Sequence, residues 1–290
     1  MNLAQRLCDR IKESRKRVLV MGDAMIDRWV HGVVEECQDN CPKFIQQGAF
    51  VRPGGAANAL QCLDNWGTTT ELFSFGIPQQ SIKTRFVVNN KIVYRHDDDG
   101  PSLRADRKLY DWTYRSAVEF INCAGAVLLS DYAKGFLTPE FIQQVVGACQ
   151  KRSIPCVADA KRAPEMYAGA ILKCNTDYQH KYNQDLGRLV FDAEKGQRLV
   201  VTTGAMNPII WDGDGPLGLG YDLPLVKCIN YVGAGDCFAA HLTLALAYGF
   251  SLKESAALAH SAGRVYVQHP HNRAPWPKEV AEDMEKQTIS

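Results

Sequence analysis

Short apolar runs recur along the chain, and each is followed by small or polar residues. The first run, residues 18–21, ends at Gly22-Asp23, as is typical of a buried parallel strand that opens onto a loop. Helix-like segments separate several of the runs, so the pattern predicts βα units and a mostly parallel sheet flanked by helices. The later runs with this pattern span residues 126–131, 155–159, 170–173 and 199–202.

Residues 29–51 and 82–97 have a different character, because they are extended and interrupt the βα series. The second stretch contains two strand-like runs on either side of Asn89-Asn90, which predicts a hairpin. Segments of this kind do not easily join a parallel sheet. We therefore expect both to form a small separate β-sheet that projects over the strand ends as a lid.

The two ends of the chain are predicted to be helical. A charged helix precedes the first strand, while residues 233–250 and 252 to about 268 are rich in alanine and leucine. No internal repeat, low-complexity tract or long linker interrupts the sequence. A chain of 290 residues can form one large α/β domain over residues 1–290 or two small ones, and it buries about three quarters of its unfolded surface, so a sizeable core is expected.

The composition favours a water-soluble globular protein. Hydrophobic residues make up 46% of the chain, charged residues 22%, and the formal net charge is +1, which argues against a broad nucleic-acid surface. No apolar run approaches the roughly 20 residues of a membrane span, and residues 1–17 lack the apolar core of a signal peptide. We therefore expect a cytoplasmic protein with no membrane partner.

Ten cysteines are scattered through apolar stretches, which predicts free buried thiols and not a disulfide framework. Cys37 and Cys41 are the closest pair. No second pair or histidine cluster follows at a spacing typical of zinc sites, so a structural metal site is not expected.

The segment 232–238 carries the most informative chemistry. Gly233, Ala234 and Gly235 directly precede an apolar helix, where free backbone N–H groups can converge on an anion. Asp236 lies within this phosphate-cradle pattern and can take a proton from an attacking hydroxyl. The alternative is a glycine-rich turn with an aspartate that caps the helix.

Two further segments offer groups that suit sugar hydroxyls. Gly54 and Gly55 stand at a predicted helix start, and Asn58 supplies both donors and an acceptor, although the glycines can equally serve packing. Asp23 and Asp27 follow the first strand. Their carboxylates can accept hydrogen bonds from neighbouring hydroxyls, or they can be solvated loop acids.

These three motifs occur together and in order, and the chain resembles the ribokinase (PfkB-type) family of carbohydrate kinases. Segments 22–28, 52–58 and 129–135 are similar to their counterparts in bacterial D-glycero-β-D-manno-heptose 7-phosphate kinases. The resemblance extends from residue 18 to about residue 267. It implies one ribokinase-like domain with a β-lid that often forms a dimer contact, so we expect a homodimer through the lid.

The resemblance also implies roles for individual residues. Asp236 is the expected general base, and the N–H groups of Gly233, Ala234 and Gly235 are the expected anion hole. The sugar is expected to bind Asp23, Asp27, Gly54, Gly55 and Asn58. A phosphate already carried by the sugar needs a cation, for which the candidates are Lys134, Lys161, Arg85 and Arg95, with surface solvation as the alternative for each. ATP and Mg²⁺ are the implied cofactors, with Asn175, Lys161, Thr202, Gly204 and His260 at the nucleotide and Asp177 at the metal.

The chain departs from the family pattern on the nucleotide side. The usual Asn-x-x-Glu reads Asn175-Thr176-Asp177-Tyr178, so tyrosine stands at the glutamate position, although Asp177 can reach a hydrated Mg²⁺ from one residue earlier. Asn230 and Val232 replace the usual aspartate and threonine. The usual glycine-bearing turn after Thr202 is altered at 204–208, and segment 73–82 is too short for a further helix and strand.

Two hypotheses from different classes follow. The first is an ATP-dependent kinase of a sugar or sugar phosphate, with the anomeric hydroxyl of heptose 7-phosphate as the leading acceptor. The second is a kinase-derived binding or regulatory protein that keeps the fold and loses catalysis. The intact base and anion hole favour the enzyme. A Rossmann-type dehydrogenase is disfavoured, because Gly22-Asp23-Ala24-Met25 does not supply Gly-x-Gly-x-x-Gly.

Overall fold

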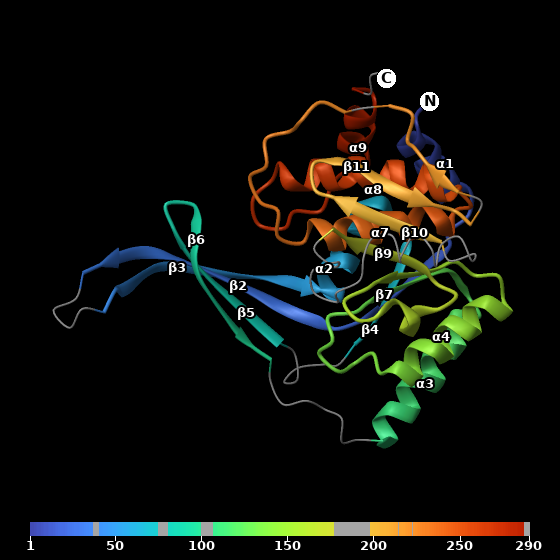
Figure 1. Cartoon of the computed structure of the whole chain (residues 1–290), viewed down its shortest axis with the longest axis horizontal. Helices are drawn as coiled ribbons and strands as arrows, with labels where there is room; N and C mark the ends of the chain where they lie inside the picture. The colour runs from blue at the N-terminus through green and yellow to red at the C-terminus, as the bar shows by residue number, and fades with distance from the viewer. Residues whose placement is uncertain are drawn as a thin grey trace.

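The main sheet is mostly parallel and forms the centre of the molecule (Figure 1). The structure, a computed structural model, describes residues 1–36, 41–74, 81–99, 107–176, 198–213, 215–221 and 223–286. Within these residues the strand order is β12-β11-β10-β9-β8-β7-β1-β4. The strands are β1 (Arg17–Gly22), β4 (Thr69–Phe73), β7 (Ala124–Ser130), β8 (Cys156–Asp159), β9 (Ile171–Asn175), β10 (Leu199–Thr203), β11 (Met206–Trp211) and β12 (Pro216–Leu217).

All five apolar runs that predicted buried strands are strands of this sheet. The pairs from β4 through β1, β7, β8 and β9 to β10 are parallel, and β11 and β12 add an antiparallel edge. Because the carboxyl ends of the parallel strands meet along one edge, the polar residues that follow them gather there.

Helices cover both faces of the sheet, so its strands are buried on both sides. In β1, Val18 and Val20 pack into one apolar core, and Leu19 and Met21 pack into the other. The first core contains α1 (Leu3–Glu13), α2 (Ala56–Gln61), α7 (Ala234–Ala247), α8 (Leu252–Val267) and α9 (Pro277–Met284), and the second contains α3 (Arg107–Ile121) and α4 (Pro139–Lys151). Short 3-10 turns lie at Asp64–Trp66 and Pro164–Tyr167. The predicted terminal helices are confirmed as α1, α7 and α8.

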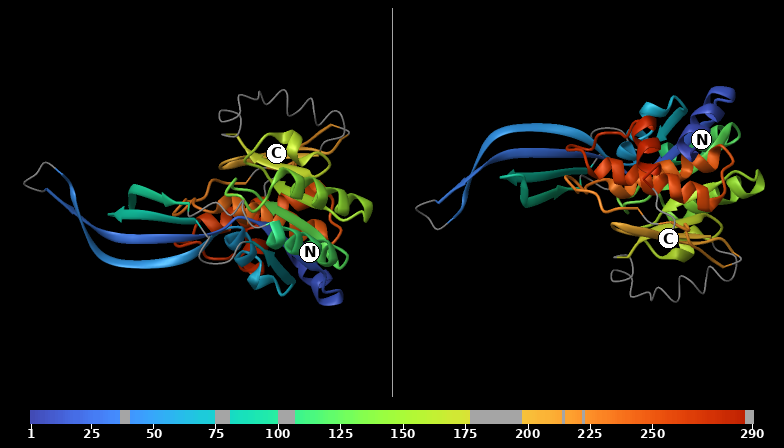
Figure 2. Two further views of the ribbon diagram at one scale, coloured as in Figure 1. Left: turned by 90° about the horizontal axis from the view of Figure 1, so that it is seen from below. Right: turned by 90° about the horizontal axis from the view of Figure 1, so that it is seen from above.

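A separate sheet projects from the body as an arm, as the views from below and above show (Figure 2). Its strand order is β3-β2-β5-β6, with β2 and β5 parallel and the other pairs antiparallel. The strands are β2 (Ala24–Glu35), β3 (Lys43–Gly55), β5 (Ser81–Val88) and β6 (Lys91–Asp98).

This arm is the sheet expected over residues 29–51 and 82–97, and the predicted hairpin is the β5-β6 pair. Asn89 and Asn90 both have positive φ, as the tight turn requires. The sheet starts earlier than expected, because residues 24–28 and 52–55 are already strands of it. The Gly54-Gly55 pair therefore ends a lid strand as well as starting α2.

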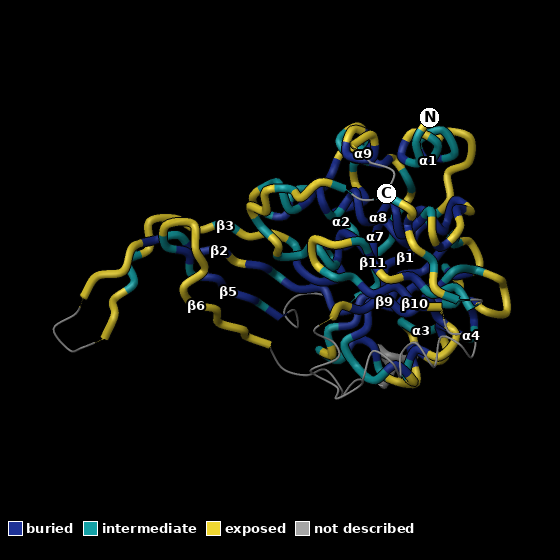
Figure 3. The backbone as a smooth tube through the Cα atoms, turned by 45° about the horizontal axis from the view of Figure 1, so that its top comes forward, coloured by how far each residue is buried: buried dark blue, intermediate teal, exposed yellow. Residues whose placement is uncertain are grey.

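The lid strands differ in burial (Figure 3). Every residue of β6 is exposed, whereas most of β5 is buried, including the polar side chains of Lys83, Thr84 and Arg85. A strand that buries charged side chains must provide partners for them or hold them for a ligand. The lid therefore brings charged groups into the interior of the molecule.

None of the helices in the described ranges is long and apolar enough to cross a membrane. The nine described cysteines are free thiols, as expected, but the expectation that they are buried is wrong for Cys41, Cys123 and Cys228, which are exposed. Cys37 lies outside the described residues.

Candidate active site

Asp236 lies in the first turn of α7 and lines a cavity of about 520 Å³. Its side chain is only 4% exposed. Gly233 caps the helix with φ 84°, and a Cβ at this position would lie 2.4 Å from both Asn58 Nδ2 and the Tyr266 hydroxyl. Glycine is therefore required here by the backbone conformation and by the close approach of these side chains.

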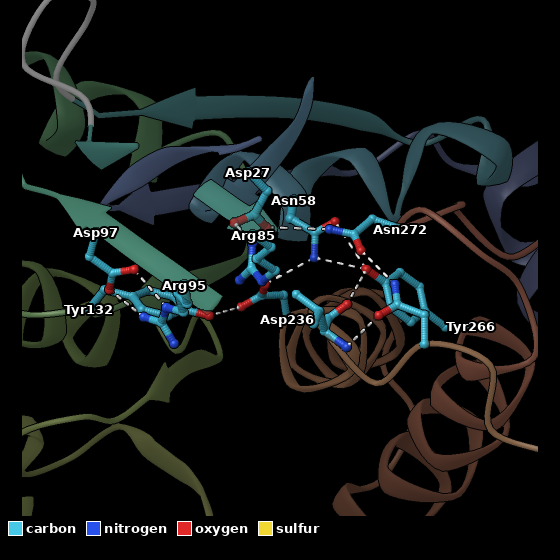
Figure 4. A network of polar contacts seen from close by, with 11 residues as sticks. Asp27, Asn58, Arg85, Arg95, Asp97, Tyr132, Asp236, Tyr266 and Asn272 are labelled. Carbon is cyan, nitrogen blue, oxygen red and sulfur yellow. Dashed lines mark hydrogen bonds and ion pairs between the residues drawn. The ribbon is translucent and has the colours of Figure 1, made fainter. Parts of the chain in front are cut away.

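Two neutral donors hold the Asp236 carboxylate (Figure 4). Asn58 Nδ2 donates to Oδ2 at 2.9 Å, and the Tyr132 hydroxyl donates to Oδ1 at 2.5 Å. Tyr266 extends the network, because its hydroxyl donates to the Val232 carbonyl at 3.0 Å and accepts from Asn58 Nδ2 at 3.4 Å. Each carboxylate oxygen has two lone pairs, so both oxygens can accept a further hydrogen bond.

Burial raises the pKa of Asp236 to about 6, and the nearby Asp159 carboxylate adds to this rise. The hydrogen bonds from Tyr132 and Asn58 and the charge of Lys161 oppose it. A carboxylate with such a pKa is ionised at neutral pH and can still take up a proton readily. That is the property a general base needs.

Asp159, at the end of β8, carries charge next to the base. Lys173 Nζ donates to Asp159 Oδ1 at 3.0 Å and also to the Gly235 carbonyl at 3.2 Å, while Lys161 Nζ lies 3.6 Å from the same carboxylate oxygen. Although burial opposes it, the charges of Lys161 and Lys173 hold the pKa of Asp159 below its usual value. Asp159 therefore stays ionised. Among the residues that the structure describes, no cation forms an ion pair with Asp236.

One of the three amides that were predicted to form an anion hole is engaged in another hydrogen bond. The Ala234 N–H donates to the Tyr231 carbonyl at 3.1 Å and is engaged within the turn. Among the described residues, the N–H groups of Gly233 and Gly235 have no backbone acceptor outside the helix. These two groups remain the candidates for binding an anion at the helix N-terminus.

Asp23 does not project toward a sugar site as expected. Its carboxylate accepts backbone N–H groups from Tyr132 at 2.9 Å, Lys134 at 3.0 Å and Phe136 at 3.1 Å. Burial raises the pKa of Asp23 above its usual value, and these bonds lower it in part. The residue shapes the loop after β7 and so positions Tyr132 against Asp236.

The expectation for Asn58 also needs correction. The side chain is completely buried and donates to Asp236, so the structure assigns it to holding this carboxylate, and its binding to a sugar hydroxyl stays a prediction. Gly54 and Gly55 mainly allow close packing. A Cβ at Gly54 would lie 3.0 Å from the Asp27 carboxylate, and one at Gly55 would lie 2.4 Å from the Asp23 carbonyl oxygen.

The expected phosphate-binding cations are paired with aspartates. Arg85 Nη1 contacts Asp27 Oδ1 at 2.6 Å in a buried ion pair, and Asn272 Nδ2 lies 3.5 Å from Asp27 Oδ2 (Figure 4). Arg95 binds Asp97, and Lys134 binds Asp99. These charges are therefore already compensated within the lid and its neighbouring loops.

The described residues that were predicted to contact the nucleotide lie together around the cavity. The cavity is lined by Asn175, Lys161, Thr202, Gly204 and His260, together with the 233–236 turn. Burial and Arg264 lower the pKa of His260 to about 4, so this ring is neutral at pH 7. Asp177 lies outside the described residues, and the described part of the chain holds no cluster of three metal-binding side chains.

Sequence reasoning missed Tyr132, Asp159, Lys173 and Lys83. Tyr132 lies inside a segment singled out for its resemblance, and Asp159 and Lys173 lie at or near the ends of predicted strands. The rule that polar residues at strand ends bind ligands could have found these three. Lys83 carries no signal in the sequence, because its importance comes from burial in the lid.

A model of pfkB family carbohydrate kinases matches residues 176–279. Among curated proteins, the chain is 26% identical to the bifunctional protein HldE of Granulibacter bethesdensis over 326 residues, which cover 96% of the chain and 66% of the relative. It is 27% identical to HldE of Methylobacillus flagellatus, with 86% of the chain and 59% of the relative covered. The chain thus spans less than two thirds of the length of these relatives.

Solved structures share the fold. A ribokinase of Arabidopsis thaliana complexed with ribose and ATP superposes with a TM-score of 0.70 at 17% identity, covering 94% of the chain and 99% of the neighbour. Phosphofructokinase-2 of Escherichia coli in complex with potassium gives a TM-score of 0.70 at 16% identity, covering 93% and 98%. The architecture is therefore ribokinase-like.

The raised pKa of Asp236 predicts a pH-dependent change in stability. Because the folded pKa is about 6 and the ordinary value is 3.8, the folded state binds the proton more tightly. The contribution of Asp236 to the free energy of unfolding should therefore decrease as the pH rises from about 4 to about 7. The decrease is up to a few kcal/mol, at about 1.4 kcal/mol per pKa unit. The Asp236→Asn variant has no titrating carboxyl group at this position, so its stability should not show this decrease.

Thermal or chemical unfolding of both proteins at pH 4 and pH 8 measures this effect. We expect the stability of Asp236→Asn relative to wild type to be higher at pH 8 than at pH 4. This comparison cancels any fixed cost of altered hydrogen bonds to Asn58 and Tyr132. An equal difference at the two pH values would contradict the raised pKa.

Proposed function

Because the chain carries a domain of the pfkB carbohydrate kinase family, we propose that it transfers the γ-phosphoryl group of ATP to a hydroxyl of a sugar phosphate. The observation that carries this proposal is the position of Asp236. Its buried carboxylate lies beside free amides at the N-terminus of α7, at the wall of a cavity. A base and an anion-binding group thus adjoin the same space, as phosphoryl transfer requires.

Asp236 acts in this mechanism as the general base. The acceptor hydroxyl donates its hydrogen bond to a remaining lone pair of the carboxylate. As the hydroxyl oxygen attacks the γ-phosphorus, its proton passes to Asp236, the bond to the β-phosphate oxygen breaks and ADP leaves. Asn58 and Tyr132 hold the carboxylate during this step, which limits its movement.

The cavity supplies the donor side. The amides of Gly233 and Gly235 stabilise negative charge on the transferring group, since helix N-termini favour anions. Lys161 lines the same cavity and is held near Asp236 by its pairing with Asp159. Met206 and Tyr231 provide exposed apolar and aromatic surface at the cavity, which suits a nucleotide base.

Mg²⁺ would be carried mainly by the phosphates of the nucleotide. The described cavity carboxylates are engaged, Asp159 by two lysines and Asp236 by Asn58 and Tyr132. Mg²⁺ is commonly held by substrate phosphates, waters and one or two carboxylates, and it neutralises phosphate charge. Asp177 is the residue we propose as its protein ligand.

Heptose 7-phosphate is the acceptor that we propose, with transfer to its anomeric hydroxyl. Two findings support this choice. The segments 22–28, 52–58 and 129–135 are similar to those of bacterial heptose 7-phosphate kinases, and the curated relatives are bifunctional HldE proteins at 26–27% identity.

A binding or regulatory protein is the second candidate. Asn230, at the position where the family usually has an aspartate, favours it. In this chain the Asn230 side chain is engaged, because Oδ1 accepts the Val232 N–H at 3.0 Å and Nδ2 donates to Asn272 at 3.0 Å. Asn230 thus stabilises the turn that leads to the anion hole, which is a role compatible with either candidate.

An ADP-release assay with Mg-ATP across a panel of sugars and sugar phosphates tests the enzyme. We expect turnover that is highest with heptose 7-phosphate, and a loss of at least about 10³-fold in kcat for Asp236→Asn, because general-base catalysis contributes about 10²–10⁴-fold. The KM values should change little. Lys151→Gln, an exposed change on α4, serves as a control that keeps activity.

Absence of ADP release with every acceptor, combined with retained binding of ATP or sugar by calorimetry, would favour the second candidate. Turnover that survives in Asp236→Asn would instead exclude Asp236 as the base.

We also propose that the protein forms a homodimer through the lid. Val34, Val51 and Val93 are exposed apolar residues on lid strands, and β3 and β6 are edge strands of this sheet. Exposed edges and apolar side chains favour pairing. Light scattering should give the mass of a dimer for the wild type and of a monomer for Val34→Asp/Val51→Asp, whereas a monomeric wild type would contradict this arrangement.

A further inference from the structure

Lys83 is a buried cation of the lid whose charge is not used by the folded protein. Its residue is only 8% exposed. Its ammonium lies 4.6 Å from the centre of the Tyr132 ring, the tyrosine that donates to Asp236. Within the described part of the chain, the Lys83 ammonium makes no hydrogen bond or ion pair that would compensate its burial.

The carboxylates next to Lys83 are held by arginines. In the sheet, Lys83 on β5 is paired with Asp27 on β2 and with Asp97 on β6. Asp27 binds Arg85, and Asp97 binds Arg95. These three cations and two carboxylates leave one positive charge in this part of the lid, and it resides on Lys83.

An unpaired buried ammonium is costly, because burial removes it from water. Burial and the neighbouring Arg95 lower the pKa of Lys83, while Asp27 and Asp236 oppose this shift. The contact with the Tyr132 ring provides some stabilisation, but a cation–π contact is weaker than a hydrogen-bonded ion pair in a buried site. A bound anion would supply the missing partner.

The Tyr132 ring lies close to two lysines, Lys83 and Lys161. Lys161 lies 5.3 Å from the centre of the same ring, lines the cavity and is paired with Asp159. Lys83 does not line the cavity. An anion bound by Lys83 would therefore contact a residue that does not line the cavity in which we propose that ATP binds.

We propose that Lys83 binds the phosphate group that the acceptor sugar already carries, and that it makes the enzyme selective for phosphorylated over unphosphorylated acceptors. This inference rests on the proposed kinase function. It differs from the expectation for Arg85, Arg95 and Lys134, whose charges are compensated by Asp27, Asp97 and Asp99. Lys83 supplies the uncompensated charge, and the three other cations fix the shape of the lid around it.

Calorimetry with pairs of phosphorylated and parent sugars tests the proposal without turnover. Wild type should bind the phosphorylated member of at least one pair more tightly. Lys83→Gln should raise its Kd by about tenfold or more, the range expected for loss of a charge-assisted hydrogen bond. Lys83→Arg should retain part of the affinity, the parent sugar should bind equally to all variants, and Lys151→Gln should behave as wild type.

Thermal unfolding separates this role from a structural one. Removal of an unpaired buried charge should not destabilise the ligand-free fold, so Lys83→Met should melt at or above the wild-type temperature. Lower melting temperatures of both Lys83→Met and Lys83→Gln without ligand would assign Lys83 a structural role and overturn the proposal.

The remaining outcomes distinguish this inference from the kinase function. If Lys83→Gln lowers kcat/KM equally for phosphorylated and parent acceptors, Lys83 acts on the transfer step, and the selectivity proposal fails while the kinase stands. If phosphorylated sugars bind through Lys83 but no ADP is released, the inference stands while the kinase function fails. If wild type binds no phosphorylated sugar more tightly than its parent, the proposal is overturned.

Discussion

The carboxylate of Asp236 is buried at the N-terminus of α7 and held there by neutral donors alone, and the rest of the site depends on this arrangement. Asn58 reaches it from α2, and Tyr132 reaches it from the loop after β7. Each of these contacts connects segments more than 100 residues apart in the chain. Folding therefore brings the groups that hold the carboxylate together. Asn58 and Tyr266 also approach Gly233 so closely that no side chain fits at this position.

The buried aspartates around the site differ in pKa and in role because they have different partners. Asp159 has two lysines beside it and keeps a lowered pKa, whereas the pKa of Asp236, without a cation in contact, is raised to about 6. Asp23 is satisfied by backbone amides and shapes a loop, and Asp27 is paired with Arg85. Among the aspartates that the structure describes, Asp236 alone combines access to the cavity with a pKa near neutrality, which suits proton transfer at physiological pH.

The main sheet and the lid could be predicted from the sequence, because both follow from local patterns of apolar and polar residues. Apolar runs that end in polar residues become parallel strands, and their ends meet at one edge. Asn175, Thr202 and Gly204 were expected at the nucleotide from the family resemblance, and they line the cavity. The glycine-rich turn before Asp236 likewise predicts a helix N-terminus whose amides can bind an anion.

The sugar side could not be predicted in the same way, because a polar side chain does not reveal in sequence which partner it will take. Asn58 and Asp23 looked like ligands for hydroxyl groups, and the fold engages them with Asp236 and with backbone amides. Lys83 lies in the predicted hairpin, and nothing in the sequence distinguished it from its neighbours. Its burial depends on how the lid sheet packs against the loop that carries Tyr132, which no local pattern encodes.

Carbon-13 NMR of the aspartate carboxyl groups tests this account most directly, with the Asp236 signal identified by its absence in Asp236→Asn. In the ligand-free wild type, we expect the Asp236 carboxyl to titrate near pH 6. In Tyr132→Phe it should titrate at higher pH, because the lost hydrogen bond stabilised the ionised form. Titration near pH 4 in the wild type, or an unchanged pKa in Tyr132→Phe, would contradict a buried base held by Tyr132.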